Sequence, residues 1–235
     1  MPELPEVETV CRGLRPILEG AEIASLLTRR EGLRKPFPPD LAQRLVGRRV
    51  ARVSRRAKYI LIHMESGDGT LLILHLGMSG RVKVDQPGSD HREPGLHDHL
   101  IIKTREGAQI MLNDARRFGQ VALADAASLP DHPLLGHLGP EPFSDDLDAS
   151  YLLAACKKRT TSMKMLLMDQ QVIAGLGNIY VSESLYRAGI SPRLKAVRLS
   201  RKRAGALIIA VRAVLDEAIL AGGSSLRDHA GINGE

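Results

Sequence analysis

The hydrophobic pattern changes once, near the middle of the 235-residue chain, and this change limits the possible folds more than any other feature. The first half has short β-branched or apolar runs separated by turn sequences, which predict hairpins. These runs are residues 50–64, 70–76, 81–84, 100–104 and 109–112, with turns at 66–69 and 106–107. The second half has helical spacing at residues 148–159, 162–174, 179–188 and 199–220. Strands followed by helices predict an α+β protein with two domains.

A further helix is expected at the start of the chain. Pro5 near its first turn, followed by Glu6 and Glu8, favours a helix over residues 4–18 that ends before Gly20. We therefore predict an N-terminal helix and an antiparallel β-sandwich within residues 1–132. A proline-rich linker follows over 133–147, and a helical domain over 148–235.

The composition favours a polyanionic partner. The net charge is +6, and each Lys or Arg that contacts a phosphate releases condensed counterions. Aromatic residues make up only 3%, which argues against binding single strands on stacked aromatic rings. No apolar run reaches about 18 residues, and the N-terminus lacks the layout of a signal peptide. We expect no membrane partner and a cytoplasmic location.

The N-terminus offers a nucleophile. Removal of Met1 would expose the secondary amine of Pro2, and an N-terminal amine has a pKa near ~8. Its neutral form can attack an aldehyde-level carbon such as C1′ of deoxyribose and form an iminium ion. Glu3 precedes the helix and adjoins this amine, so it can move protons during base loss and sugar-ring opening. Taken alone, Pro2 could also be a proline that simply starts a chain.

Residues 2–16, PELPEVETVCRGLRP, resemble the N-terminus of formamidopyrimidine-DNA glycosylases. The resemblance implies that Pro2 is the Schiff-base nucleophile and Glu3 the proton donor. It favours the branch that acts on oxidised purines, because endonuclease VIII, which prefers oxidised pyrimidines, begins with a different pattern. It also implies a bacterial protein that works on the nucleoid.

Three more segments in the first half carry the resemblance. Residues 55–59 (RRAKY) resemble a family strand whose lysine, here Lys58, assists strand cleavage by β-elimination. Residues 75–80 (HLGMSG) and 113–119 (NDARRFG) resemble signatures whose side chains fill the gap left by a flipped nucleotide. In the second of these, Ala115 replaces a proline. The gap-filling residues implied are Met78, Arg116 and Phe118.

Residues 169–180 resemble the family's helix-two-turn-helix. The resemblance suggests that Gly175 and Gly177 let backbone approach a phosphate, and that a new helix then begins with free N–H groups facing the anion. Residues 222–235 resemble the start of a loop that covers the flipped base. The complete set of implied DNA contacts is His75, Met78, His97, Arg116, Phe118, Arg159 and Asn178.

The resemblance does not extend to the C-terminal zinc finger of typical relatives. Cys11 and Cys156 are the only cysteines, neither falls in a CxxC pair, and they cannot supply a four-ligand site. We expect no metal site and no cofactor in this chain. Truncation and a natural zinc-less variant both remain open. Without the finger, weaker DNA binding is expected, and the sequence leaves open whether δ-elimination survives.

The sequence therefore predicts a monomeric base-excision repair enzyme for double-stranded DNA. It would remove 8-oxoguanine or formamidopyrimidines through a Schiff base on Pro2 and then cleave the strand by β-elimination. Three alternatives remain: an oxidised-pyrimidine glycosylase of the endonuclease VIII type, a lesion-binding module without catalysis, and a helical duplex-DNA binder that needs no free N-terminus.

Overall fold

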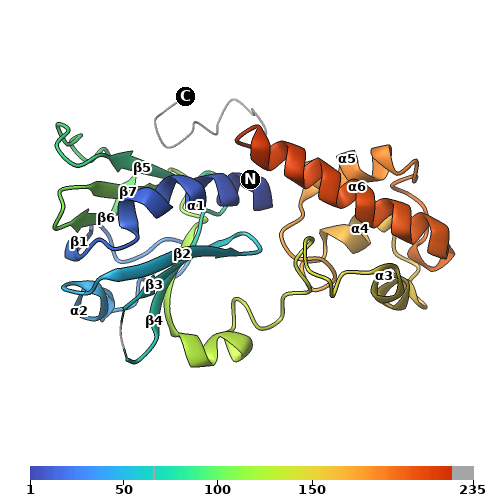
Figure 1. The fold of residues 1–235 in the computed structure, drawn as a ribbon, viewed down its shortest axis with the longest axis horizontal. Coiled ribbons are helices and arrows are strands. Elements are labelled where there is room, and N and C mark those ends of the chain that lie inside the picture. Colours follow the sequence, from blue (N-terminus) through green and yellow to red (C-terminus); the bar gives the residue numbers. More distant parts are fainter. Residues whose placement is uncertain (66, 224–235) are drawn as a thin grey trace.

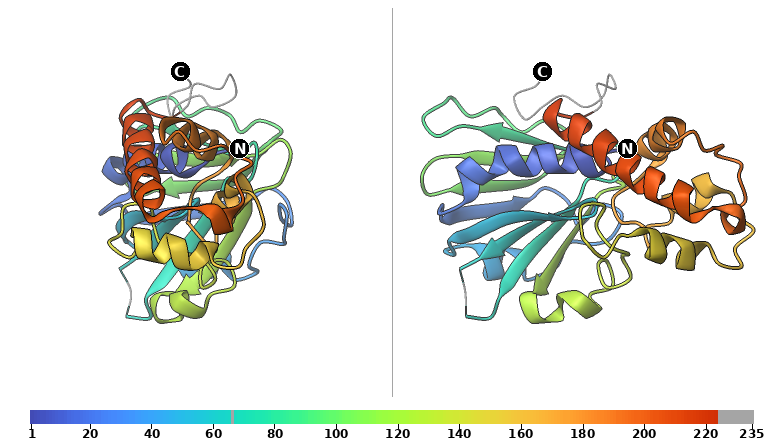
Figure 2. Two further views of the ribbon diagram at one scale, coloured as in Figure 1. Left: turned by 90° about the vertical axis from the view of Figure 1, so that its right-hand side faces the viewer. Right: turned by 45° about the vertical axis from the view of Figure 1, so that its right-hand side comes forward.

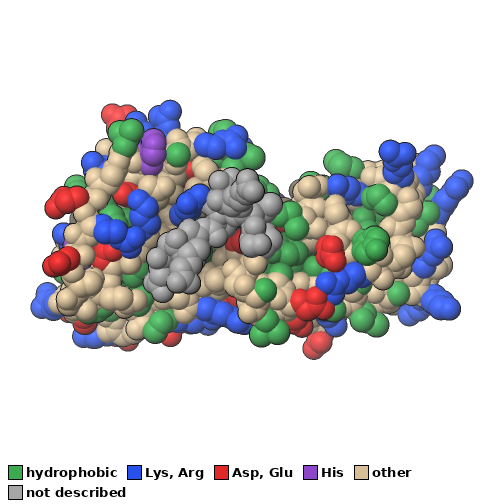
Figure 3. All heavy atoms as spheres, turned by 90° about the horizontal axis from the view of Figure 1, so that it is seen from above, with side chains coloured by type: hydrophobic (Ala, Val, Ile, Leu, Met, Phe, Trp, Pro, Cys, Tyr) green, Lys and Arg blue, Asp and Glu red, His purple; other side chains and the backbone are tan. Residues whose placement is uncertain are grey.

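The computed structural model describes residues 1–65 and 67–223. They form a β-rich lobe and a helical lobe that lie side by side (Figure 1), and the outline narrows between them (Figure 3). The predicted α+β architecture, with its sandwich ahead of a helical part, is confirmed. Most of the segment expected to resemble a covering loop, from residue 224 onward, lies outside the described residues.

The β-rich lobe contains two four-stranded antiparallel sheets, ordered β1-β6-β7-β5 and β2-β3-β4-β8. Their strands are β1 (Ile23–Thr28), β2 (Val50–Arg56), β3 (Tyr59–Met64), β4 (Thr70–His75), β5 (Arg81–Asp85), β6 (Asp98–Thr104), β7 (Gln109–Asn113) and β8 (Gln120–Asp125). The lobe also contains the short helix α2 (Leu41–Leu45) and the 3-10 turn η1 (Ala126–Asp131).

Helix α1 (Leu4–Leu18) has the predicted bounds and packs on β2. Its apolar side joins residues of both sheets in one core, to which it contributes Val7, Cys11, Leu14 and Leu18. Figures 1 and 2 show the helix running along the sandwich to the helical lobe, where its N-terminal end meets α6. The start of the chain is therefore held at the junction of the two lobes.

The helical lobe contains α3 (Ala149–Cys156), α4 (Met163–Met168), α5 (Asn178–Arg187) and α6 (Arg201–Leu220), with the 3-10 turn η2 (Ala196–Arg198). Ser and Asp side chains cap three of these helices: Asp148 caps α3, Ser162 caps α4 and Ser200 caps α6. The core of this lobe includes Leu4, which comes from the start of the chain. Among residues 1–65 and 67–223, no helix is long and apolar enough to cross a membrane.

The prediction of a single strand through RRAKY is wrong. Residues 50–64 form two strands, β2 and β3, joined at Ala57 and Lys58. Ala57 has a φ of 51°, a left-handed conformation that Gly or Asn usually adopts in such turns. The sequence therefore carries no ordinary turn signal at this point.

The helix predicted over 162–174 is also too long, because α4 ends at Met168. Beyond that point the side chain of Gln170 bonds to the backbone of the turns that follow. Its Nε2 donates to the carbonyl oxygens of Met168 (3.0 Å) and Leu176 (2.7 Å), and its Oε1 accepts from the Gly175 N–H (2.9 Å). One polar side chain thus organises the turns between α4 and α5.

Candidate active site at the junction of the lobes

The structure places Pro2 and Glu3 where the two lobes meet, at the end of the chain marked N in Figure 1. Pro2 is buried and Glu3 is only 2% exposed. Because Met1 precedes Pro2, the Pro2 nitrogen becomes a free amine only when Met1 is removed. An amine formed here would lie beside the Glu3 carboxyl group.

The Glu3 carboxylate reaches across to the helical lobe. Its Oε1 accepts from the N–H of Ile179 (3.0 Å) and its Oε2 from the N–H of Tyr180 (3.4 Å), in the first turn of α5. Burial raises the pKa of Glu3, and the Ile179 N–H and the Lys58 charge offset only part of this rise. A carboxyl group with a raised pKa is suited to donating a proton near neutral pH.

The two glycines before α5 serve the N-terminus rather than an open anion site. A Cβ on Gly177 would lie 2.4 Å from Cδ of Glu3, and one on Gly175 would lie 2.7 Å from Leu4. The expectation that this helix begins with free N–H groups facing a phosphate is wrong for Ile179 and Tyr180, which are already bonded to Glu3. The exposed Asn178 side chain stands at the same helix start.

Glu6 belongs to the same network, although sequence reasoning gave it only a helix-capping role. Its Oε2 accepts from the Glu3 N–H (2.8 Å), and its Oε1 accepts from the Tyr180 hydroxyl (2.5 Å). Glu6 is 7% exposed and Tyr180 is 3% exposed. Tyr180 ends the segment 169–180 that resembles the helix-two-turn-helix, but nothing in the sequence indicated that its hydroxyl would donate to Glu6.

Lys58 lies in the β2–β3 turn with 6% of its surface exposed. Burial lowers its pKa, and the negative charges of Glu3 and Glu6 raise it by a smaller amount. The structure thus brings together the three residues proposed from sequence as catalytic. The lowered pKa gives Lys58 a larger neutral fraction near pH 7 than an exposed lysine has.

His75 ends β4 beside this group, with its ring centroid 4.7 Å from that of Tyr59. Its Nδ1 accepts from the Gly77 N–H (3.0 Å), so the proton of the neutral ring is on Nε2. Burial, with smaller effects of Lys58 and Arg34, lowers the pKa of His75 to about 4. His75 is therefore a neutral ring with one N–H available for donation. Arg34 was not identified from the sequence, where it is one of several arginines.

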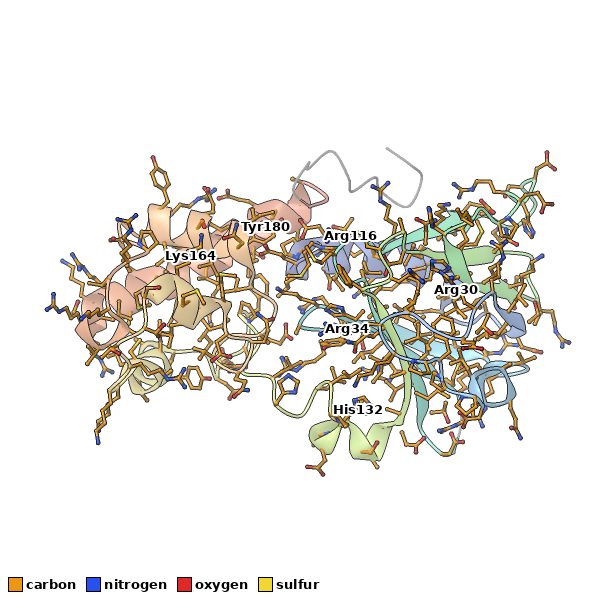
Figure 4. All side chains as sticks on the ribbon, turned by 180° about the vertical axis from the view of Figure 1, so that it is seen from behind. Arg30, Arg34, Arg116, His132, Lys164 and Tyr180 are labelled. Atoms are coloured by element: carbon orange, nitrogen blue, oxygen red, sulfur yellow. The ribbon has the colours of Figure 1, made fainter. Side chains whose placement is uncertain are left out.

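The gap-filling candidates are held together on two adjoining turns. Met78 is 43% exposed and Phe118 is 42% exposed, and the Arg116 guanidinium lies 5.0 Å from the centroid of the Phe118 ring. Buried Asp114 joins the turns, because it accepts from Ser79 Oγ (2.6 Å) and from the Gly119 N–H (2.7 Å). In Figure 4, Arg116 and Arg34 lie on the side of the β-rich lobe nearest the helical lobe, whereas Arg30 lies farther along it.

The remaining DNA-contact candidates lie apart from this group. His97 is exposed and lines a pocket of about 400 Å³ with Arg30 and Arg117. Its neighbour His99 is buried and donates from Nε2 to the carbonyl oxygen of Asp114 (2.9 Å). The Arg159 side chain is about half exposed, and its Nη1 lies 3.6 Å from Oδ2 of Asp169.

Cys11 and Cys156 are buried in the cores of different lobes. Burial raises the pKa of Cys11 to about 12. Within the described part of the chain, no group of three or more His, Cys, Asp or Glu side chains is arranged to hold a metal ion. The described residues therefore do not form a site that fits the zinc ion associated with the family.

A two-sheet β-sandwich joined to a helix-two-turn-helix lobe is the architecture of a DNA glycosylase. Residues 1–121 match the formamidopyrimidine-DNA glycosylase N-terminal domain, and residues 138–230 match the formamidopyrimidine-DNA glycosylase H2TH domain. The chain belongs to the formamidopyrimidine-DNA glycosylase family.

Individual relatives agree with this assignment. The formamidopyrimidine-DNA glycosylase of Paracoccus denitrificans is 54% identical over 240 residues, covering 100% of this chain and 84% of the relative. That of Rhodospirillum rubrum is 52% identical, covering 100% and 82%. Wild-type Lactococcus lactis Fpg, solved with DNA containing N7-benzyl-Fapy-dG, has a TM-score of 0.87 at 34% identity, covering 100% of this chain and 85% of that one. MutM with DNA containing carbocyclic 8-oxo-G gives a TM-score of 0.86 at 34% identity, with the same coverage.

Proposed function

We propose that this protein removes oxidised purines, 8-oxoguanine and formamidopyrimidines, from double-stranded DNA and then cleaves the strand at the abasic site. The observation that carries the proposal is the position of Pro2 and Glu3, buried where the lobes meet, with Lys58 close enough to affect the pKa of Glu3. The names of the relatives and the damaged DNA bound by similar structures support the same substrate class.

In the proposed reaction, the neutral Pro2 amine attacks C1′ of the damaged nucleotide. The N–C1′ bond forms as the glycosidic bond breaks, and the departing base takes the proton that the Pro2 nitrogen loses. Glu3, whose pKa is raised by burial, gives a proton to the ring oxygen as the sugar opens to the iminium ion. Pro2 thus holds the sugar covalently while the strand remains intact.

Strand cleavage follows from the iminium ion. A proton passes from C2′ to water as the 3′ phosphate oxygen departs, which breaks the C3′–O bond by β-elimination. We assign Lys58 to hold this phosphate and pass a proton to the leaving oxygen, because it is buried beside Glu3 and has a lowered pKa. No metal is part of the proposed chemistry, since the amine, the acid and Lys58 supply its nucleophile and protons.

The other candidates are proposed to hold the DNA. Met78, Arg116 and Phe118 would fill the gap left by the flipped nucleotide, while His75, His97, Arg159 and Asn178 would contact the backbone. We also propose a monomer in the bacterial cytoplasm, with the domain division 1–132, 133–147 and 148–235. The neutral ring of His75 would donate a hydrogen bond to a phosphate, and the guanidinium of Arg159 would add an electrostatic contact.

The test is borohydride trapping on a duplex with one abasic site, at low salt, which favours phosphate contacts. Protein with Met1 removed is expected to form a covalent adduct that maps to Pro2. Protein with an uncleaved N-terminal extension is expected to bind the duplex without forming it. Intact binding without an adduct in both samples would instead identify a lesion-binding module.

A second comparison tests the substrate class. Single-turnover excision is measured on duplexes that contain 8-oxoguanine or thymine glycol. We expect faster release of 8-oxoguanine. Faster release of thymine glycol would contradict the proposal and favour the endonuclease VIII type of specificity.

A further inference from the structure

Residues 138–141 lie between two functional turns, one in each lobe. On one side, Nη2 of Arg56 donates to the carbonyl oxygens of Leu138 (3.1 Å) and Gly139 (2.6 Å). On the other side, the Gly139 N–H donates to the carbonyl oxygen of Gln170 (2.9 Å), and the Pro140 carbonyl oxygen accepts from Ala174 (3.0 Å). This part of the predicted linker therefore contacts both the turn that carries Lys58 and the turns that precede α5.

The contact between residues 138–141 and the helical lobe is close enough to require glycine. A Cβ on Gly139 would lie 2.4 Å from the carbonyl oxygen of Gln171. The segment thus has a fixed position on the helical lobe, from which Glu141 extends to the β2–β3 turn.

The Glu141 carboxylate receives three hydrogen bonds from that turn. Its Oε1 accepts from the Ala57 N–H (2.6 Å) and from Nη1 of Arg56 (2.7 Å), and its Oε2 accepts from Nη1 of Arg55 (2.7 Å). The Glu141 side chain is 23% exposed and that of Arg55 is 12% exposed. Charge-assisted bonds of this length in a partly buried place are among the stronger polar contacts in proteins.

The turn needs such support because of Ala57. Its φ of 51° is in the left-handed region, which an L-residue with a Cβ adopts only when its surroundings hold it there. Both backbone polar groups of Ala57 are engaged: Glu141 accepts from its N–H, and Nη1 of Arg55 donates to its carbonyl oxygen (2.9 Å). Lys58 follows directly, so the backbone conformation at Ala57 sets the direction of the Lys58 side chain.

Arg55 also connects this turn to α1, the helix that follows Pro2 and Glu3. Its Nε lies 3.3 Å from Oε2 of Glu8, on α1, a few residues after Pro2 and Glu3. One set of ion pairs, Glu8–Arg55–Glu141–Arg56, therefore joins α1, the β2–β3 turn and residues 138–141.

We propose that Glu141 is a positioning residue for strand cleavage: it holds the Ala57–Lys58 turn so that Lys58 points into the site beside Glu3. This inference rests on the proposed role of Lys58 in β-elimination. Glu141 touches neither Pro2 nor Glu3 in any described contact, so it acts through the turn. The reaction step that depends on Glu141 is therefore β-elimination and not the attack of Pro2 on C1′.

The first test measures the position of Lys58 without using activity. Reductive methylation of each lysine is followed by mass spectrometry in wild-type protein and in Glu141→Ala. We expect Lys58, which is 6% exposed, to react at least fivefold faster in the variant, with exposed Lys202 unchanged. A rate for Lys58 within twofold of wild type would overturn the inference.

The second test separates the two chemical steps on an abasic-site duplex. Glu141→Ala is expected to slow β-elimination at least tenfold while the yield of the borohydride adduct at Pro2 stays within twofold. Glu217→Gln is the control, because Glu217 also pairs with an arginine (Arg187, 2.6 Å) but lies on the surface of the helical lobe; it is expected to match wild type. Elimination that stays within twofold of wild type in Glu141→Ala would contradict the proposal.

Two further variants, Glu141→Gln and Lys58→Ala, separate the role of Glu141 from protein folding and from the role of Lys58. If Glu141→Ala does not fold, Glu141→Gln keeps the side-chain shape and one acceptor oxygen, and is expected to slow elimination about threefold by losing the arginine pairs; an unchanged rate would overturn the inference. Lys58→Ala is measured in parallel. Normal elimination in Lys58→Ala would refute the proposed role of Lys58, whereas the methylation result would still decide whether Glu141 positions it.

Discussion

At the scale of single residues, Glu3 has a structural role in addition to its proposed role as proton donor. Its carboxylate takes the place that a Ser or Asp cap would take at the start of α5, and so joins the two lobes. The same contacts bury the acid beside Pro2 and Lys58, and burial raises its pKa. The proposed proton donor therefore depends on the contact between the lobes for the burial that raises its pKa.

Gly177→Ala tests this arrangement, because the new Cβ would lie 2.4 Å from Cδ of Glu3. Displacement of Glu3 is expected to slow lesion excision at least tenfold and to lower the free energy of unfolding by about 1–3 kcal/mol. Urea unfolding and single-turnover excision measure the two effects. Gly205→Ala is the matched control, since a Cβ there meets nothing within 4 Å inside α6; it should stabilise by about 0.5–1 kcal/mol. If Gly177→Ala and Gly205→Ala had equal excision rates and equal free energies of unfolding, the role given to the Gly177–Glu3 contact would be refuted.

The pH dependence of stability is a second prediction at this scale. The pKa of His75 is lowered to about 4 in the folded state, from an ordinary value of 6.5. Between these values the unfolded chain binds more protons, so the contribution of His75 is present above pH 6.5 and is lost as pH falls to 4, by up to about 3 kcal/mol. The free energy of unfolding of His75→Gln should therefore fall less steeply over this range. A wild-type slope in His75→Gln would contradict the prediction.

At the scale of elements, the turn over residues 114–117 invites a proline. The Arg117 N–H donates to the Asp114 carbonyl oxygen (3.3 Å), and Ala115 occupies the second position, where Pro is favoured. Ala115→Pro is expected to stabilise the protein by about 0.4–1 kcal/mol by restricting the unfolded chain, which raises Tm by roughly 1–4 °C. Differential scanning fluorimetry measures this change. A lower Tm would show that the backbone at Ala115 does not suit proline.

The sequence predicted the elements well where one local pattern acted alone. Pro5 and the acids after it marked α1, and the turn at Glu106–Gly107 marked the β6–β7 hairpin. It failed where a distant residue decides the local conformation. The left-handed Ala57 depends on Glu141, which is 84 residues away. The end of α4 depends on bonds from the Gln170 side chain, which helical periodicity cannot reveal.

The sequence predicted which residues belong to the candidate site, but it did not predict how they contact one another. Motifs named Pro2, Glu3 and Lys58, and the structure brings these together. They did not reveal that Glu3 would occupy the start of α5, because that contact joins residues 176 positions apart. Glu6 and Glu141 were missed for the same reason, since their partners come from other elements.

At the scale of the whole molecule, the N-terminus couples the unfolding of the lobes. Leu4 is fully buried in the core of the helical lobe, and its N–H donates to the Gly175 carbonyl oxygen (3.1 Å). Calorimetry of the wild-type protein should therefore show one transition. Leu4→Ala should lower stability by about 2–5 kcal/mol and divide the transition into two.

Leu72→Ala is the control for this prediction. Leu72 is also fully buried, but within the core of the sandwich alone. Leu72→Ala should lower stability to a similar degree but should still unfold in one transition. The substitution weakens the core of the β-rich lobe and leaves the contact between the lobes intact. A divided transition in Leu72→Ala, or a single one in Leu4→Ala, would show that Leu4 does not couple the lobes.

The burial of Glu3 against Ile179 has a consequence for the order of events during synthesis. The N-terminus leaves the ribosome first, yet its partners at 175–180 are made about 175 residues later, roughly 10–35 s at 5–20 residues per second. During this interval residues 2–4 lack their partners in the helical lobe, so an aminopeptidase that acts on Met1 would have access to it. Removal of Met1 would therefore be easiest before α5 is made and its N–H groups bind Glu3.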